Sequence, residues 1–453
     1  MSISIECFKA YDVRGKVPDE LNEDTSYNIG RAYAEFLKPA NVIIGRDIRL
    51  TSKIICDALS RGLLDSGVNV FDIGICGTEE VYFAVSNEKM DGGIMVTASH
   101  NPMNYNGMKF VREDAGPISS DSGLNVIRDM TANNEFQTPG KRGIFSALDI
   151  DGKYIAHLLK YVDIDSLRPY KVVVNAGNGC AGRIVDLLER YLPLSFIKIN
   201  HEPDGRFPNG MPNPLLPENR DATINAIRNH NADIGVAWDG DFDRCFFFDE
   251  KGNFIEGYYI VALLADAMLA KYPNSKVIHD PRLTWNTIDI VTKKGGIPVQ
   301  SKTGHAFIKE RMRMENAVYG GEMSAHHYFR DFAFCDSGMI PWLMVLEIMS
   351  ATGKTLSELV DKRIKLFPVS GEINRRLKNP QAVINYIAER YKADASSIDY
   401  TDGLSMEFSD WRFNLRTSNT ESVLRLNVEA RGSEQLLRDK TGELLELIDS
   451  FHE

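Results

Sequence analysis

Three short segments, far apart in the chain, carry the residue types that a phosphoryl-transfer reaction needs. Residues 97–102 (TASHNP) place a serine in a loop, residues 239–244 (DGDFDR) place three aspartates at alternate positions, and residues 416–420 (RTSNT) place an arginine beside short polar side chains. A serine can carry a phosphoryl group, carboxylates hold a hard cation, and arginine binds phosphate through two parallel donors. These are complementary parts of one reaction, so their joint presence predicts a phosphoryl-transfer site.

The acidic segment predicts a metal site. Asp239, Asp241 and Asp243 can converge on one cation from an extended turn, and Mg²⁺ is the natural occupant of such an oxygen cage. An EF-hand loop is the competing metal site, because Glu250 would fit its twelfth position. However, Arg244 occupies the sixth position, where that loop needs glycine, and the flanking IGVAW and CFFF read as strands. A solvated acidic turn is the alternative without a metal.

The serine loop follows a buried-strand pattern, so the hydroxyl of Ser99 is expected at the carboxyl edge of a sheet. No GxSxG elbow surrounds this serine. Its direct neighbour is His100, and adjacent residues seldom have the through-space geometry that an acyl-transfer base needs. The chain therefore does not read as a serine hydrolase, whereas a phosphorylated Ser99 would need the charge neutralisation that a cation supplies. A plain turn is the alternative for TASHNP, and an ordinary loop is the alternative for RTSNT.

A glycine-rich segment at residues 177–182 (GNGCAG) offers a different function. It matches GxGxxG after a strand and before a helix, with Glu202 and Asp204 beyond the next apolar run, as in a dinucleotide-binding oxidoreductase. Such an enzyme would give no role to DGDFDR or RTSNT. The same glycines also suit a tight strand-to-helix turn with close packing.

The elements that position these loops read as repeated βα units. Short apolar runs at residues 42–44, 172–174 and 277–278 are each followed by a turn and a helix-like segment, which is typical of buried parallel strands. A second set of runs, at residues 93–96, 234–238 and 317–319, leads directly into polar loops. We therefore expect three domains with one shared plan. The end of the chain differs, with strand patterns at 404–408, 411–415 and 422–428 and a helix at 434–448, which predicts a small α+β domain.

Length and composition favour a multidomain protein that acts on small molecules. The chain has 453 residues, more than one hydrophobic core usually organises, with 43% hydrophobic residues and 25% charged residues. Its net charge of −11 gives no electrostatic footprint for nucleic acid. The start lacks a signal-peptide pattern, and the apolar stretch at 258–270 is too short to span a membrane, so we expect a cytoplasmic protein without a membrane partner. Six scattered cysteines contain no CxxC pair and read as reduced packing residues.

Six motifs, in order, resemble the α-D-phosphohexomutase family, in particular its bacterial phosphomannomutase branch. They are FKAYDVRG from residue 8, TASHNP, DGDFDR, KTGHAFIK from residue 302, GEMSAHHYF from residue 321, and RTSNT. The resemblance implies an α/β protein of three similar α/β domains with mixed sheets, plus a smaller, mobile C-terminal α+β domain, around a central cleft. We expect the domains at residues 1–150, 151–252, 253–367 and 368–453.

The resemblance also implies a role for each site residue. Ser99 matches the phosphoserine, and its phosphate would complete a Mg²⁺ site with Asp239, Asp241 and Asp243. Phospho-Ser99 would donate to a hexose monophosphate, and the hexose 1,6-bisphosphate intermediate, which also serves as activator, would turn around and return its other phosphate. The remaining matches are Arg14, Lys109 and His305 near the transferred group, with the general base left open among them; Glu322 and Ser324 on the sugar hydroxyls; Arg244, Arg282 and His326 as further contacts; and Arg416, Ser418, Asn419 and Thr420 on the non-reacting phosphate.

The working sugar is less closely defined. The GEMS form is similar to phosphomannomutases and dual-specificity enzymes, which favours mannose phosphate and a role in supplying GDP-mannose for polysaccharide synthesis. Ala325 stands where the family usually has glycine. A phosphoglucomutase or dual-specificity enzyme is the first alternative, and a metal-dependent phosphatase or a non-catalytic sugar-phosphate-binding protein is the second. The sequence does not indicate an oligomeric state.

Overall fold

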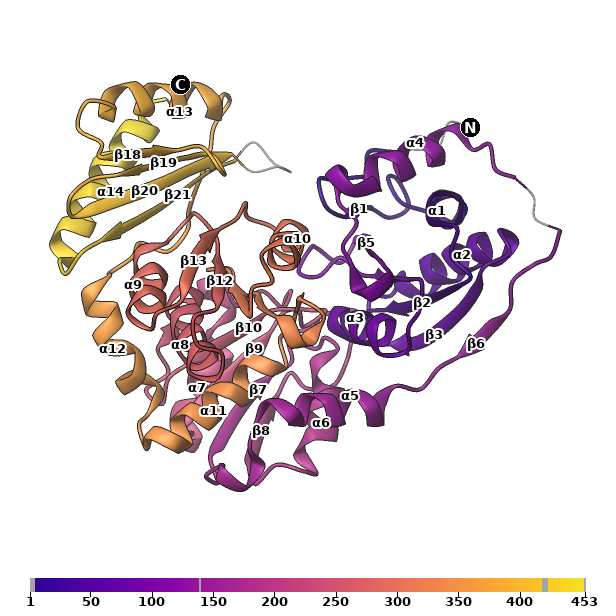
Figure 1. The fold of residues 1–453 in the computed structure, drawn as a ribbon, viewed down its shortest axis with the longest axis horizontal. Coiled ribbons are helices and arrows are strands. Elements are labelled where there is room, and N and C mark those ends of the chain that lie inside the picture. Colours follow the sequence, from indigo (N-terminus) through magenta and orange to yellow (C-terminus); the bar gives the residue numbers. More distant parts are fainter. Residues whose placement is uncertain (1–4, 138–139, 418–422, 452–453) are drawn as a thin grey trace. The chain divides into compact units, whose positions relative to one another are not determined.

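The computed structural model describes residues 5–137, 140–417 and 423–451. The chain divides into two compact units, Met1–Ile255 with His326–Thr355 and Glu256–Ala325 with Leu356–Glu453. It therefore passes from one unit to the other three times (Figure 1). Among the described helices, none is both long and apolar enough to cross a membrane.

The first unit begins with a six-stranded mixed sheet in the order β1-β5-β4-β2-β3-β6. β2 pairs in parallel with β3 and β4, whereas β5 is antiparallel to both β4 and β1. The predicted runs at 42–44 and 93–96 are buried strands of this sheet, because helices cover both faces. The strands are β1 (Val13–Lys16), β2 (Asn41–Arg46), β3 (Asn69–Ile75), β4 (Gly92–Val96), β5 (Tyr105–Arg112) and β6 (Phe145–Ala147). The helices are α1 (Glu23–Leu37), α2 (Ser52–Asp65), α3 (Thr78–Asn87) and α4 (Asn125–Asn133).

A second sheet in the same unit has the order β11-β10-β9-β7-β8. β7 is parallel to β8 and β9, and β10 returns antiparallel to β9. The acidic segment is the connection between β9 and β10, so strands flank it on both sides and the EF-hand alternative is wrong. The strands are β7 (Lys171–Asn175), β8 (Ser195–Ile199), β9 (Ile234–Trp238), β10 (Cys245–Phe248) and β11 (Phe254–Ile255), with helices α5 (Asp151–Leu158), α6 (Ala181–Glu189) and α7 (Asp221–His230).

The third α/β region contributes to both units. In the second unit β12 pairs in parallel with β13 and β14, and in the first unit β15 pairs antiparallel with β16. The parallel trios β3-β2-β4, β8-β7-β9 and β13-β12-β14 have the same order, which confirms the predicted shared plan. The strands are β12 (Lys276–His279), β13 (Ile297–Gln300), β14 (Tyr319–Gly321), β15 (His327–Phe329) and β16 (Cys335–Asp336). The helices are α8 (Gly257–Lys271), α9 (Trp285–Lys293), α10 (His305–Glu315), α11 (Ile340–Thr352) and α12 (Leu356–Leu366).

The C-terminal part of the second unit is an antiparallel sheet with helices, as the alternating pattern predicts. Its order is β17-β21-β20-β19-β18, and every pairing in the described sheet is antiparallel. The apolar face of this sheet packs with two helices around Phe413, Leu415 and Val428, which are fully buried. The elements are β17 (Ile373–Arg376), β18 (Ser397–Asp399), β19 (Leu404–Glu407), β20 (Trp411–Thr417), β21 (Val423–Ala430), α13 (Pro380–Tyr391) and α14 (Glu434–Asp449).

Candidate active site

Ser99 lies in the loop that joins β4 to β5 and has a strained backbone. Its φ of 49° is in the left-handed region, which costs free energy for a residue other than glycine. The loop is held by Arg49, whose guanidinium donates to the carbonyl oxygens of Ser99 (2.9 Å), Asn101 (2.6 Å) and Pro102 (2.8 Å). These bonds fix the serine at the carboxyl end of β4, as the sequence predicts.

The three aspartates of the acidic loop are fully buried and close together. One carboxylate oxygen from each of Asp239, Asp241 and Asp243 lies within 4.8 Å of the other two. The Oδ1 atoms of all three lack a hydrogen-bond partner among the described residues. Because a buried carboxylate oxygen normally needs a partner, and because hard divalent cations prefer oxygen ligands, this triad fits a metal ion.

The serine hydroxyl contacts this triad directly. Ser99 Oγ donates to Asp239 Oδ2 at 2.7 Å and lies 3.1 Å from His100 Nδ1. Burial, together with the nearby charges of Asp243 and Asp241, raises the pKa of Asp239 to about 7. A phosphoryl group on Ser99 Oγ would therefore lie beside the carboxylates that could hold a cation.

Lys109, on β5, compensates the charge of two of these carboxylates. Its Nζ lies 2.8 Å from Asp241 Oδ2 and 2.5 Å from Asp243 Oδ2. Burial alone would lower the pKa of Lys109, but Asp241 and Asp243 raise it above its ordinary value. The same lysine holds the pKa of Asp243 well below its usual range, despite the opposing effect of burial.

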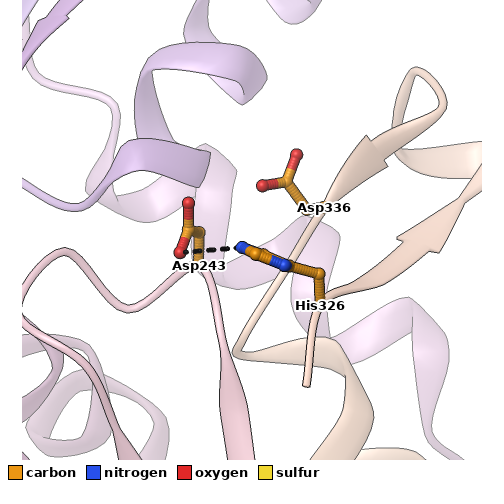
Figure 2. Close-up of side chains that lie close together, drawn as sticks. All are labelled: Asp243, His326 and Asp336. Carbon is orange, nitrogen blue, oxygen red and sulfur yellow. Dashed lines mark ion pairs between the residues drawn. The ribbon is translucent and has the colours of Figure 1, made fainter. Parts of the chain in front are cut away.

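Arg244 and His326 flank the acidic loop from the first unit. Arg244 Nε lies 3.5 Å from Asp239 Oδ2 and donates to His326 Nε2 at 3.1 Å. Figure 2 shows the imidazole of His326 directed at Asp243, with a 3.6 Å ion-pair distance to Oδ1, and the carboxylate of Asp336 nearby. Both histidine and arginine are thus within reach of a group bound at the triad.

Arg14 is anchored to the serine loop. Its guanidinium donates to Asp12 Oδ2 at 2.6 Å and to Asn101 Oδ1 at 2.5 Å. Burial disfavours the charged form, yet the carboxylate of Asp12 keeps the pKa of Arg14 above its ordinary value. The first unit therefore gathers Ser99, the aspartates, Lys109, Arg14, Arg244 and His326 around one loop pair.

The other predicted residues form a second cluster within the second unit. Arg282, in the loop after β12, donates to Asp280 Oδ2 at 2.8 Å, Glu322 Oε1 at 3.4 Å and Ser324 Oγ at 3.3 Å. The backbone N–H of Gly304, directly before His305, donates to the same Glu322 oxygen at 3.1 Å. The predicted sugar-binding residues are thus assembled by loops at the ends of β12 and β14 and at the start of α10.

Only part of the predicted phosphate clamp can be placed. Arg416 is the penultimate residue of β20 and contacts the carboxylate of Glu372 at 3.2 Å. Ser418, Asn419 and Thr420 lie outside the described residues, so their role stays a prediction.

Two residues that sequence reasoning missed support the first cluster. Thr78 Oγ1 donates to Asp241 Oδ2 at 2.6 Å and accepts from Lys109 Nζ at 3.3 Å, while its backbone N–H donates to the Asp241 carbonyl at 3.0 Å. Arg49 holds the serine loop as described above. Both follow the carboxyl ends of parallel strands, β3 and β2, and this position was the signal that could have identified them.

The GNGCAG segment serves close packing. A Cβ on Gly179 would approach the carbonyl oxygen of Gly240 to 2.7 Å, and the N–H of Cys180 donates to that same oxygen at 3.2 Å. A Cβ on Gly240 would in turn meet the Ser99 carbonyl oxygen at 2.6 Å. Glycine is therefore required where the turn supports the acidic loop, which accounts for the motif without a dinucleotide.

The fold and the type of site define a phosphoryl-transfer enzyme built on three α/β domains and an antiparallel C-terminal domain. Four family models match the chain: phosphoglucomutase/phosphomannomutase alpha/beta/alpha domain I at residues 6–138, domain II at 152–252, domain III at 256–367, and the C-terminal domain at 372–446. The chain belongs to the phosphoglucomutase/phosphomannomutase family.

Individual relatives are similar over nearly the whole chain. A phosphomannomutase of Escherichia coli is 58% identical over 452 residues, covering 98% of this chain and 99% of that protein. A protein of Xanthomonas campestris pv. campestris described as phosphohexose mutases is also 58% identical, over 446 residues, covering 98% of this chain and 100% of that protein. A solved structure of a family protein from Burkholderia thailandensis has a TM-score of 0.90 at 31% identity and covers 99% of this chain and 98% of that one.

Proposed function

We propose that this protein is a phosphomannomutase that interconverts mannose 6-phosphate and mannose 1-phosphate through phospho-Ser99 and a hexose 1,6-bisphosphate. The observation that carries this proposal is the 2.7 Å hydrogen bond between Ser99 Oγ and one aspartate of the buried triad. This bond supports the proposal because a phosphoryl group on Ser99 Oγ would lie beside carboxylates that could hold a cation. The phosphomannomutases at 54% to 58% identity favour mannose as the sugar.

The acidic triad would hold Mg²⁺ together with an oxygen of the Ser99 phosphate. When bound, Mg²⁺ would stabilise the charge that develops on the transferring phosphoryl group. Lys109 and Arg244 add positive charge from the protein, and Arg14 fixes the loop that carries the serine. Gly240 allows the two loops to approach without a side chain between them.

In the forward step, the bond between phosphorus and Ser99 Oγ breaks as a bond from phosphorus to the sugar hydroxyl forms. The hydroxyl proton passes to a base of the protein. Arg14 and Lys109 have raised pKa values and so suit charge stabilisation better than proton removal. The imidazoles of His305 and His326 are then the candidates for the base. The reverse step returns the other phosphoryl group to Ser99 Oγ and yields the isomeric monophosphate.

Substrate recognition is proposed for the second unit. Glu322 and Ser324 would bind sugar hydroxyls beside Arg282, and Arg416 with Ser418, Asn419 and Thr420 would bind the phosphate that does not react. We propose, as part of the same function, a cytoplasmic location and a role in supplying GDP-mannose.

Phosphorus NMR tests this function. Mannose 1-phosphate is mixed with the protein, Mg²⁺ and a trace of glucose 1,6-bisphosphate, and mannose 6-phosphate is expected to appear. The Ser99→Ala variant should form none, whereas Ser66→Ala, which alters a serine at the end of α2, should match the unmutated protein.

Two controls separate the alternatives. Release of inorganic phosphate in place of mannose 6-phosphate would identify a phosphatase, and an unchanged spectrum with bound sugar phosphate would identify a binding protein. Glucose 1-phosphate in a parallel sample measures the sugar preference, and removal of Mg²⁺ with a chelator should stop the conversion.

A further inference from the structure

Three arginines of the second unit converge on the side chain of Glu372. Arg416 Nη2 lies 3.2 Å from Oε2, Arg425 Nη1 lies 3.3 Å from Oε1, and Arg282 Nη1 lies 3.6 Å from Oε2. They come from β20, from β21 and from the loop after β12, so one carboxylate joins segments that are far apart in sequence.

The strand register favours an anion at this place. β20 and β21 are neighbouring strands of the C-terminal sheet (Figure 1), and in their antiparallel register Arg416 is directly opposite Arg425. Like charges in directly opposed positions destabilise a sheet unless a counter-charge lies between them. Glu372 supplies that charge, and the three arginines keep its pKa below the ordinary value although burial acts in the other direction.

The backbone holds Glu372 in this position. Ser370 N–H donates to the Val428 carbonyl at 2.9 Å, and Asn427 Nδ2 donates to the Gly371 carbonyl at 3.0 Å. Gly371 has a φ of 68°, a conformation that favours glycine and aims the next residue. The position of the carboxylate is therefore fixed by the fold, unlike that of a freely rotating surface group.

A single carboxylate does not satisfy the donors around it. Its contacts of 3.2 to 3.6 Å exceed the about 2.7–2.9 Å usual for charge-assisted bonds. The Nε atoms of Arg282 and Arg416 are buried and lack a hydrogen-bond partner among the described residues. A phosphate has more oxygens and more charge than a carboxylate, so it matches this donor set better.

We propose that Glu372 is a stand-in for the substrate's non-reacting phosphate. In the free protein its carboxylate occupies the cluster of Arg282, Arg416 and Arg425, and it gives way when a sugar phosphate binds. This inference rests on the proposed function, because Arg416 is proposed there to bind that phosphate. Glu372 keeps the arginines ordered and makes bare phosphate a weak ligand. It also eases release, since the bisphosphate intermediate must leave the clamp with one phosphate and return with the other.

The test measures binding of inorganic phosphate by isothermal titration calorimetry, which requires no turnover. Glu372→Gln removes the competing charge and keeps the shape of the side chain. We expect this variant to bind phosphate about tenfold more tightly, as the loss of one repulsive charge at short range implies. Glu389→Gln is the matched control, because it removes a charge from an exposed glutamate of α13 in the same unit. It should bind phosphate like the unmutated protein.

Turnover gives a second readout. With sugar phosphate, Glu372→Gln should show a lower KM and a lower kcat together with stronger inhibition by phosphate, whereas a merely structural role would not couple these changes. Glu372→Asp retains the charge on a shorter side chain. Its KM, kcat and inhibition by phosphate should lie between those of the unmutated protein and those of Glu372→Gln, and it replaces Glu372→Gln in the test if that variant does not fold.

Phosphate affinity that is unchanged or weaker in both Glu372 variants would overturn the inference. Failure of the unmutated protein to isomerise any hexose phosphate would instead overturn the proposed function and would leave the phosphate-binding comparison intact.

Discussion

At the scale of single residues, Lys109 is the residue on which the charge balance of the acidic loop depends. It pairs with Asp241 and Asp243 in a place that excludes water, so its loss would leave buried carboxylates without compensation. A bound divalent cation would supply positive charge to the same group of oxygens. A metal bound at the triad would therefore neutralise the same carboxylates as Lys109.

Lys109→Met should lower the free energy of unfolding of the metal-free protein by about 3–5 kcal/mol, as for other broken buried pairs. Saturating Mg²⁺ should raise the free energy of unfolding of Lys109→Met by more than it raises that of the unmutated protein. Urea unfolding in chelator and in Mg²⁺ measures both effects. The control is Lys153→Met, which removes a lysine from an exposed pair with Glu88 and should cost at most about 1 kcal/mol. An equal response of both variants to Mg²⁺ would contradict a metal at the triad.

Residue types and spacing were enough to predict the serine and the aspartates as parts of one site, because each carries its chemistry in its own side chain, whereas Lys109 was indicated only by the family resemblance. Thr78 could have been identified only from its position after the parallel strand β3, because its side chain alone does not indicate that it orients Asp241. Glu372 could not be predicted, because a glutamate that neutralises two opposed arginines acquires this role from strand register.

At the scale of elements, the first turn of α3 supports the acidic loop. Thr78, the first residue of the helix, binds Asp241 through both its hydroxyl and its backbone N–H. Gly77 directly before it leaves room for the ring of Phe242, since a Cβ there would approach that ring to 2.1 Å. The helix thus fixes the direction of a carboxylate in the loop between β9 and β10, which are strands of a different sheet.

Thr78→Val should weaken divalent cation binding by about tenfold or more, in the range usual for lost partners of metal ligands. Thr78→Ser keeps the hydroxyl and should retain nearly full affinity. Titration with Mn²⁺, followed by electron paramagnetic resonance of the free ion, measures this without turnover. Thr131→Val, a buried threonine of α4 that bonds to the Ile127 carbonyl, controls for the loss of a buried hydroxyl. Equal Mn²⁺ affinity in Thr78→Val and Thr131→Val would contradict the positioning role.

The elements themselves were predictable where apolar runs end in turns. β2, β4, β7 and β9 lie where continuous buried runs predict parallel strands, and the alternating C-terminal pattern predicts β19 and β20. The proposed domain limits stay a prediction. The sequence did not indicate that residues 326–355 belong to a different compact unit from residues 256–325, because that depends on tertiary packing.

At the scale of the whole molecule, the segment 326–355 is held in the first unit by aromatic packing. The ring of His157 lies 5.3 Å from Phe83, 5.6 Å from Tyr161 and 5.5 Å from Phe332, measured between centroids. These rings belong to three separate stretches of chain. Burial, with a further effect of Lys160, lowers the pKa of His157 to about 4.

This depressed pKa predicts an acid-dependent loss of stability. Between pH 6.5 and 4 the unfolded chain binds a proton at His157 that the folded chain does not, so the free energy of unfolding falls as the pH falls. The loss should be roughly 1–2 kcal/mol after allowance for partial exposure. His157→Phe should remove it, while His230→Phe, at the exposed end of α7, should not. Urea unfolding across this pH range measures the slopes, and parallel slopes for His157→Phe and the unmutated protein would contradict the assignment.

The buried carboxylate of Glu79, at the second position of α3, has a consequence for the order in which the protein can be made. It accepts hydrogen bonds from Tyr154 Oη at 2.5 Å, Ser337 Oγ at 2.7 Å and the N–H groups of Gly338 at 2.5 Å and Met339 at 3.2 Å. On the ribosome, residues 1–255 emerge well before residues 337–339, and residues 256–325 between them belong to the other unit. For roughly 5–15 seconds at typical elongation rates, a nascent chain that has already translated its serine loop and its acidic loop must keep Glu79 hydrated. Completion of the first unit therefore waits for the start of α11, and the unit that contains Ser99 and the acidic triad matures only after most of the chain has been synthesised.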